Sequence, residues 1–412
     1  MEEISGNCKT CKHYWDGQCK LTNKTALGKC SVYEDCLVNL IQLHDKYKEL
    51  LYIEDTKRID ILLAVVLSAK LEGIPIWLIL VGASGDMKSA QLNAIRTPES
   101  YLLHNLTSKT LVNGYKDKLK FPDLAPELHN KIVLIPDMAQ LLKLPPIEKG
   151  ELWGQLRDLY DGFAGKSSGM GSTAKYKDLK VTLIGGSTPA IDSQILVHQD
   201  LGTRELIYRT EGNLDKNKVM EKCFENEEIE ERIKKELEEI TTRFLVQRDI
   251  KRAFIASETY SKIKEIATYI TYMRATAEVD YSDELRNIVY PEEPTRIAKQ
   301  LKKLYVCLMS LSDDYPEDRT MEILWKIGRS SAFPLRIKVF EFLLNEKEYS
   351  TSQVAEILHI GKSTAKRELN ILWNMNLVCC RKEPTNYPNL NYDYWRLNIE
   401  HSFIKSVSKS NR

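Results

Sequence analysis

The sequence predicts a mixed α/β fold built on a parallel sheet, and three observations lead to this prediction. Short apolar runs at 76–81, 132–135 and 181–184 have the length of buried strands. Helical patterns separate these runs, as expected when crossover helices join parallel strands. A glycine-rich loop directly follows the first run. After about residue 212 the pattern becomes helical and charged, so we expect the sheet in the first half of the chain.

Composition narrows the class of protein. The chain has 412 residues, enough for two or three domains, and 43% of them are apolar, as in ordinary globular proteins. A net charge of +1 indicates no particular partner. No apolar stretch reaches the ~18 residues of a membrane span, and the start, Met1-Glu2-Glu3, is unlike a secretory signal. We therefore predict a cytoplasmic protein without a membrane partner.

Five of the nine cysteines lie within residues 1–36, a segment too poor in apolar residues to fold by burial alone. In a cytoplasmic protein such a cluster favours a metal site over disulfides. Four thiolates at these spacings can close a tetrahedral Zn²⁺ site, which would supply the missing folding free energy. A [4Fe–4S] cluster could use the same ligands. The predicted ligands of this metal-binding module are Cys8, Cys11, Cys19 and Cys30, with Cys36 as a spare.

Residues 82–89 carry the strongest chemical signal. They are Gly82, Ala83, Ser84, Gly85, Asp86, Met87, Lys88 and Ser89. A strand, this loop, Lys-Ser and then a helix, expected from Ala90, are typical of a P-loop that binds the phosphates of ATP. The glycines let backbone N–H groups turn toward phosphate, Lys88 reaches the β- and γ-phosphates, and Ser89 can ligate Mg²⁺. Because Met87 stands where a glycine normally precedes the lysine, a glycine-rich turn with a surface lysine stays an alternative.

Two polar residues follow the second and third apolar runs. Asp137 comes after a strand expected next to the P-loop, the place of a Walker B residue that holds Mg²⁺. Its alternative role is to cap the following helix. Thr188 follows Gly185-Gly186-Ser187 and can position an attacking water, whereas an ordinary Ser-Thr-Pro turn is the alternative.

Arg204 precedes the strand-like run 206–209. From there it could reach the γ-phosphate held by a neighbouring subunit, as an arginine finger does. On sequence pattern alone, a surface salt bridge is the simpler explanation.

Taken in order, these motifs resemble the AAA+ ATPases, most closely the minichromosome maintenance (MCM) helicases and the MCM-like helicases of phages and mobile elements. The resemblance covers roughly residues 60–310 and rests on "GASGDMKSAQL" and "LGTRELIYR". It implies a ring-forming ATPase with an ATPase core over 37–212 and a helical lid and connector over 213–333. An insert between 151 and 180 would be aimed at DNA. The implied catalytic residues are Asp137, Thr188, Arg204 and, as sensor 2, Arg296.

The chain departs from this family at one catalytic position. The family places a glutamate, the base that activates water, directly after the Walker B aspartate. This chain has Met138 there. Either Asp137 takes the glutamate role, with Pro136 in place of the metal-binding aspartate, or the base is absent.

The segment 334–412 reads as three helices followed by two strands. Ser350 to Ser352 cap the second helix, and the third begins at Lys362. In the third helix Ala365, Leu369 and Leu372 should point inward. From 361 to 412 there are nine Lys/Arg and four Asp/Glu. The pattern resembles winged-helix DNA-binding domains, with a docking module for protein as the alternative. The implied DNA contacts are Lys362, Ser363, Thr364, Lys366 and Arg367, the last two directed outward.

The sequence thus predicts an ATP-dependent DNA-binding protein. It would be a DNA helicase or helicase loader that acts in the replication of a phage, plasmid or integrated element. It would work as a homo-oligomeric ring, together with other replication proteins. The competing prediction is an ATP switch, either a slowly hydrolysing initiator or a transcription regulator. Met138 favours the switch, and the insert between Asp137 and Val181 favours the helicase.

Overall fold

The computed structural model describes residues 14–15, 18–19, 38–113, 122–167, 173–192, 203–210, 215–251, 254–277, 289–384 and 391–410. The chain divides into two compact units. Unit 1 consists of Met1–Pro189, Arg209–Ala253 and Lys303–Ile323. Unit 2 consists of Ala190–Tyr208, Phe254–Lys302 and Leu324–Arg412. No helix within the described ranges is long and apolar enough to cross a membrane.

A five-stranded sheet forms the α/β part of the chain, in the order β4-β5-β8-β3-β9. Its strands are β3 (Trp77–Val81), β4 (Ser100–Leu102), β5 (Lys131–Ile135), β8 (Val181–Ser187) and β9 (Leu206–Arg209). The pairs β4–β5, β5–β8 and β3–β8 are parallel, which confirms the expected α/β sheet. Every residue of β3 and β8 is buried. This burial explains why the sequence shows continuous apolar runs rather than alternation.

Strand β8 is longer than the apolar run predicted, because it continues past Ile184 to Ser187. It lies between β3 and β5, so the expectation that the strand before Asp137 is the direct neighbour of β3 is wrong. Two glycines of β8 let the segment Pro136–Met138, which follows β5, lie close against this strand. A Cβ on Gly185 would lie 2.5 Å from Met138 Sδ, and one on Gly186 would lie 2.4 Å from the carbonyl oxygen of Pro136.

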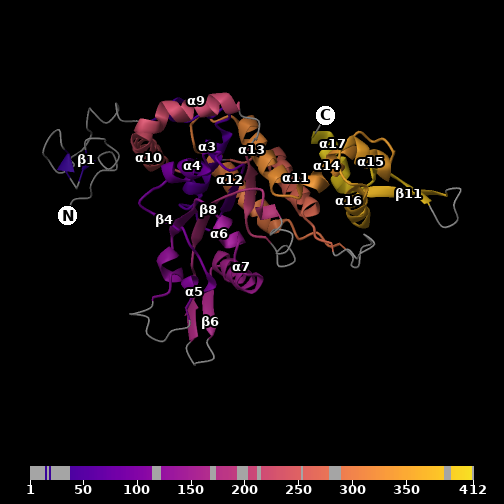
Figure 1. Ribbon diagram of the computed structural model, residues 1–412, viewed down its shortest axis with the longest axis horizontal. Helices are drawn as coiled ribbons and strands as arrows, with labels where there is room; N and C mark the ends of the chain where they lie inside the picture. Colours follow the sequence, from indigo (N-terminus) through magenta and orange to yellow (C-terminus); the bar gives the residue numbers. More distant parts are fainter. Residues whose placement is uncertain are drawn as a thin grey trace. The chain divides into compact units, whose positions relative to one another are not determined.

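The helices of unit 1 surround this sheet. Two helices precede β3, namely α2 (Leu40–Leu50) and α3 (Lys57–Ser68), and α3 is buried at nearly every position. Helix α4 (Lys88–Ala94) begins two residues before the predicted start. Helix α10 (Glu230–Val246) packs against α2 and α4 (Figure 1). The remaining elements are α5 (Ser108–Leu111), η2 (Ala125–Leu128), α6 (Ala139–Leu142), α7 (Pro146–Tyr160), α9 (Lys216–Asn226) and η4 (Glu227–Ile229).

A hairpin follows α7, within the insert 151–180. Its strands are β6 (Ala164–Ser167) and β7 (Thr173–Tyr176), which pair antiparallel and project from unit 1 (Figure 1). A second small hairpin, β1 (Tyr14–Trp15) and β2 (Gln18–Cys19), lies in the cysteine-rich segment. The predicted metal ligands Cys8, Cys11 and Cys30 lie outside the described residues.

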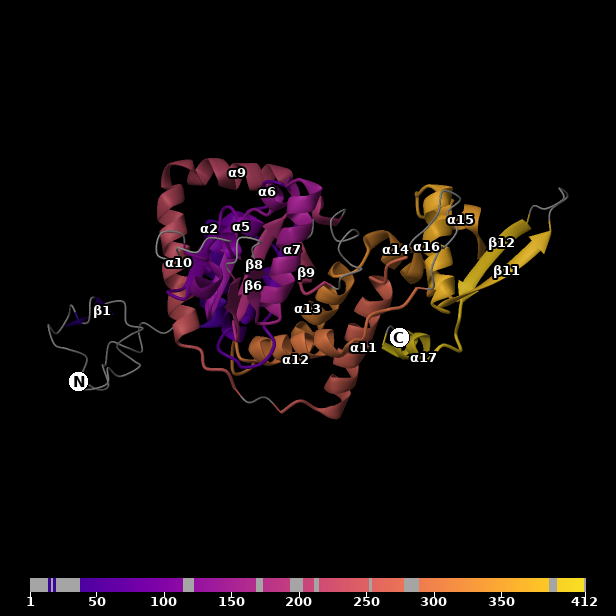
Figure 2. The ribbon, with the colours of Figure 1, turned by 90° about the horizontal axis from the view of Figure 1, so that it is seen from below.

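Unit 2 contains the three helices and two strands expected after 334. The helices are α14 (Pro334–Leu343), α15 (Thr351–Ile357) and α16 (Lys362–Asn374), and the strands are β11 (Val378–Pro384) and β12 (Asn391–Leu397). A short strand that the sequence did not predict, β10 (Tyr349–Ser350), completes an antiparallel sheet in the order β10-β12-β11. Strands β11 and β12 extend as a ribbon beyond α16 (Figure 2). The other helices after 250 are α11 (Ser257–Met273), α12 (Thr295–Met309), α13 (Glu317–Ser330) and α17 (Ser402–Ser410).

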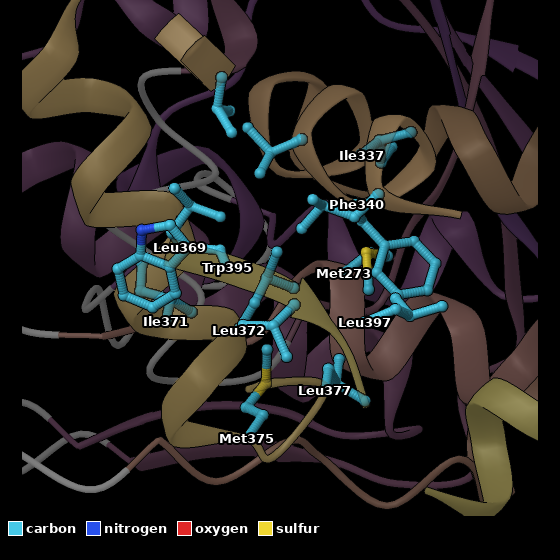
Figure 3. Packing of buried hydrophobic residues seen from close by; sticks show 14 of the residues in the cluster. Met273, Ile337, Phe340, Leu369, Ile371, Leu372, Met375, Leu377, Trp395 and Leu397 are labelled. Atoms are coloured by element: carbon cyan, nitrogen blue, oxygen red, sulfur yellow. The ribbon is translucent and has the colours of Figure 1, made fainter. Parts of the chain in front are cut away.

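One apolar cluster holds this part of unit 2 together. The predicted inward residues Ala365, Leu369 and Leu372 are fully buried in it. They pack with Phe340 and Trp395, and Met273 of α11 joins the same cluster (Figure 3). As predicted, Ser350 caps α15, because its side chain accepts a hydrogen bond from the backbone N–H of Gln353.

Candidate functional site

The loop 82–89 connects β3 to α4 through two residues in the left-handed region. Gly85 has φ +82° and Met87 has φ +50°. The second value explains why glycine is usual before the lysine, since a side chain there costs about 1–2 kcal/mol. Met87 therefore accepts strain and keeps the loop geometry. Gly82 is required sterically, because a Cβ there would lie 2.1 Å from Thr210 Oγ1.

Lys88 is the first residue of α4, and its side chain reaches back to the start of the loop. Its Nζ donates to the carbonyl oxygens of Gly82, at 3.0 Å, and Ala83, at 2.6 Å, and the residue is buried. An ammonium group has three donors, and no side chain or carbonyl in the described part of the chain takes the third. Burial lowers the pKa of Lys88, an effect that the Asp86 carboxylate opposes. A poorly hydrated cation with a donor to spare is suited to bind an anion.

Asp137 and Ser89 approach the same end of the sheet. Ser89 Oγ donates to the carbonyl oxygen of Pro136 at 3.4 Å, which brings the start of α4 beside the end of β5. Asp137 is exposed, and its Oδ1 accepts from the backbone N–H of Ala139 at 2.8 Å. This bond forms a turn just before α6, but the N-cap of α6 is Met138 and no side chain caps the helix, so the capping role that the sequence left as an alternative is not confirmed. A carboxylate has further acceptor sites, so the turn does not exclude a metal ligand.

Met138 faces the interior. Its side chain is 2% exposed and packs over Gly185, and its backbone N–H donates to the carbonyl oxygen of Gly186 at 2.8 Å. The position where the resembling family has its glutamate therefore points into the core. Asp137 is the carboxylate at this strand end that faces solvent, which favours the first of the two arrangements considered for the base.

Thr188 follows β8 between the loop and Asp137. The carbonyl oxygen of Ser187 accepts from the backbone N–H of Gly82 at 3.2 Å, so the end of β8 is tied to the loop. Ser187 is itself buried, and its hydroxyl donates to the carbonyl oxygen of Thr188. Thr188 is half-buried. Of the two residues, Thr188 is the more exposed.

Arg204 and Arg296 both belong to unit 2. Arg296 lies in the first turn of α12, and its Nη2 donates to the carbonyl oxygen of Thr203 and to Glu292, each at 2.7 Å. One turn later, Gln300 Nε2 donates to the carbonyl oxygen of Arg204 at 2.8 Å. Helix α12 thus holds two consecutive carbonyls of the Arg204 segment. Sequence reasoning missed Glu292 and Gln300, because neither belongs to a motif.

The predicted DNA contacts on α16 are less free than expected. Lys362 and Ser363 are exposed, and Thr364 is half-buried. Lys366 is 43% exposed and pairs with Asp393 of β12 at 2.6 Å. Arg367 is 38% exposed and pairs with its neighbour Glu368 at 3.3 Å. The outward cations are therefore partly neutralised within unit 2.

Sequence reasoning also missed Arg58, in the first turn of α3. Its Nη1 donates to Asp86 Oδ1 at 3.0 Å. A signal was present, since the rest of α3 after Arg58 is apolar apart from Asp60 and Ser68, and a buried arginine requires an anionic partner.

Of the predicted zinc ligands, only Cys19 is placed, in β2. Within the described ranges no group of three or more His, Cys, Asp or Glu side chains is arranged to hold a metal ion. No protein-family model and no curated protein matches this chain.

Proposed function

We propose that this protein is an ATP-dependent DNA-binding ATPase of the AAA+ type, acting as a helicase or helicase loader in the replication of a phage, plasmid or integrated element. The observation that carries the proposal is the meeting of Lys88, Thr188 and Asp137 at one end of β3, β8 and β5. In open α/β sheets, ligands bind outside the carboxyl ends of the strands. A buried cation, a hydroxyl and a carboxylate there suit a nucleotide with its metal.

Each residue has a role in this proposal. Lys88 binds the β- and γ-phosphates, and Ser89 and Asp137 hold Mg²⁺, for which oxygen donors are suited. Thr188 orients the attacking water, and Asp137 is the nearest candidate for its base. Arg204 acts on the nucleotide of a neighbouring subunit, which requires a homo-oligomer. The backbone contacts of Arg296 and Gln300 would keep Arg204 in position.

The DNA-binding part of the proposal rests on α16 and the β11–β12 ribbon. A helix that begins with Lys362 and Ser363 exposed, beside a two-stranded ribbon, suits a winged helix entering the major groove. The hairpin β6–β7 carries Lys166 and Lys175, which suits a second contact with DNA. We place the protein in the cytoplasm, with replication proteins as partners.

A Cys₄ zinc site completes the proposal. Purified protein should contain about one zinc per chain, and Cys11→Ser should lose it. A brown protein absorbing near roughly 400 nm would indicate iron–sulfur instead.

Steady-state ATP hydrolysis with and without single-stranded DNA tests the enzyme. We expect hydrolysis that DNA stimulates. Arg204→Ala should bind ATP but not hydrolyse it, and mixing it with Lys88→Ala should restore activity at mixed interfaces. The proposed homo-oligomeric ring is wrong if the mixture of variants stays inactive and the protein elutes as a monomer in size-exclusion chromatography.

A second function is favoured by the identity of Met138, which stands where the resembling family has its catalytic glutamate. If Asp137 only holds the metal, no base remains at this strand end, and the protein is an ATP switch that initiates replication or regulates transcription. The switch predicts tight ATP binding with slow turnover that DNA does not change.

A further inference from the structure

Arg58 and Asp86 form an ion pair that is almost completely buried. Arg58 Nη1 lies 3.0 Å from Asp86 Oδ1, and the two side chains are 9% and 7% exposed. Arg58 comes from α3, whereas Asp86 is part of the loop 82–89 itself. The pair therefore joins the loop to a helix that no motif includes.

The second oxygen of Asp86 faces the loop. Within the described residues, Asp86 Oδ2 is buried and has no hydrogen-bond partner. It lies 2.5 Å from the point where a Cβ on Gly82 would stand. The carboxylate thus borders the space between the glycine at the start of the loop and Lys88.

A carboxylate at this place opposes the binding of phosphates. Like charges within a few ångströms repel each other strongly where water is excluded. Alone, Asp86 would cancel the charge of Lys88, the cation within the loop. Arg58 restores the balance, because its guanidinium neutralises Asp86 from the side of α3.

We infer that Arg58 is a positioning residue of the nucleotide site, which keeps Asp86 neutralised so that the charge of Lys88 is available to a nucleoside polyphosphate. The inference rests on the proposed binding of ATP by the loop. It adds a residue outside the P-loop to the site. It also requires that the loss of affinity on removing Arg58 be larger for a nucleotide with more phosphates.

The test measures binding of fluorescent ATP and ADP analogues to the full chain at low and high KCl. Arg58→Met removes the charge at similar length, Asp86→Asn removes the carboxylate at similar shape, and the double variant removes both. Lys57→Met is the matched control. It removes a positive charge one residue away on α3, where Lys57 is 30% exposed and pairs with Glu322.

We expect Arg58→Met to weaken ATP binding about tenfold, as an unpaired carboxylate near the phosphates requires. The loss should be smaller for ADP and should shrink at high KCl. Asp86→Asn removes the repulsion between the carboxylate and the phosphates, so it should bind ATP more tightly than the wild type. The double variant should bind ATP within about threefold of Asp86→Asn. A purely structural role would weaken ATP and ADP equally, without dependence on salt.

Several results would overturn the inference. The inference is wrong if Arg58→Met binds ATP as Lys57→Met does, if Arg58→Met loses affinity for ATP and ADP equally, or if Asp86→Asn loses affinity for ATP. If Arg58→Met does not fold, the comparison of the double variant with Asp86→Asn decides, since neither contains an unpaired carboxylate. If the wild type binds neither nucleotide, the proposed function falls as well. If the wild type binds ATP and Arg58→Met binds it equally well, only the inferred role of Arg58 is wrong.

Discussion

The loop 82–89 and the start of α16 both present lysines, but the two regions hold them differently. Lys88 is buried and contacts two carbonyl oxygens, so its charge is directed but not neutralised. Lys366 is half-exposed and pairs with the carboxylate of Asp393. Neutral carbonyl partners leave a cation ready for an anionic ligand, whereas a carboxylate must be displaced first. A motif shows where a charge lies in the sequence but not what it is paired with.

The largest effect should come from the carboxylate that organises the α16 region. Glu368 pairs with Arg336, which is 3% exposed, and with Arg367. Glu368→Leu leaves the buried guanidinium uncompensated, so the free energy of unfolding of unit 2 should fall by about 3–5 kcal/mol. Chemical denaturation monitored by tryptophan fluorescence measures this loss. Glu400→Leu, which removes an exposed carboxylate from unit 2, is the control and should change little.

In the loop 82–89, removing the buried cation should weaken ligand binding rather than lower the free energy of unfolding. Lys88→Ala eliminates the charge-assisted hydrogen bond to phosphate, so ATP binding should weaken by about 2–3 kcal/mol. A fluorescent ATP analogue measures the affinity, and Lys109→Ala, at an exposed position of α5, serves as the control. Native affinity in Lys88→Ala would refute the P-loop interpretation.

The comparison also shows how far sequence reasoning reaches. Period and run length predicted β3, β5, β8 and the inward residues of α16, because these features depend on local burial. The loop was recognisable because its chemistry is contiguous in the sequence. The structure adds that Met87 takes the left-handed conformation that glycine usually supplies.

What escaped prediction depends on partners far away in the sequence. Arg58 and Asp86 are 28 residues apart, Lys366 and Asp393 are 27 apart, and Gln300 reaches Arg204 across 96. The position of β8 between β3 and β5 also follows from packing around Gly185 and Gly186, which no local pattern encodes. Pairings of this kind appear only when the fold brings the elements together.

Removing both cations of α16 should have a moderate effect. Replacing Lys366 and Arg367 with Ala should weaken duplex DNA binding and reduce the slope of log affinity against log salt. Two free phosphate contacts would lower the slope by roughly two. Because both side chains are already paired, we expect a reduction nearer to about one. Unchanged affinity with an intact circular dichroism spectrum would mean that this segment docks protein.

The smallest and most specific effect should follow from removing the partner of Lys366. Asp393→Asn keeps the shape of β12 and frees the ammonium group, since Asp393 is 10% exposed and contacts Lys366 directly. If Lys366 meets a phosphate, it no longer has to leave a carboxylate, so duplex DNA affinity should rise a few-fold and the salt slope should steepen by up to about one. Fluorescence anisotropy over a range of KCl concentrations measures both quantities. Asp393→Asn combined with Lys366→Ala is the control and should cancel the gain. A gain that survives in this combination would show that the lost negative charge acts generally, and that Lys366 does not contact DNA.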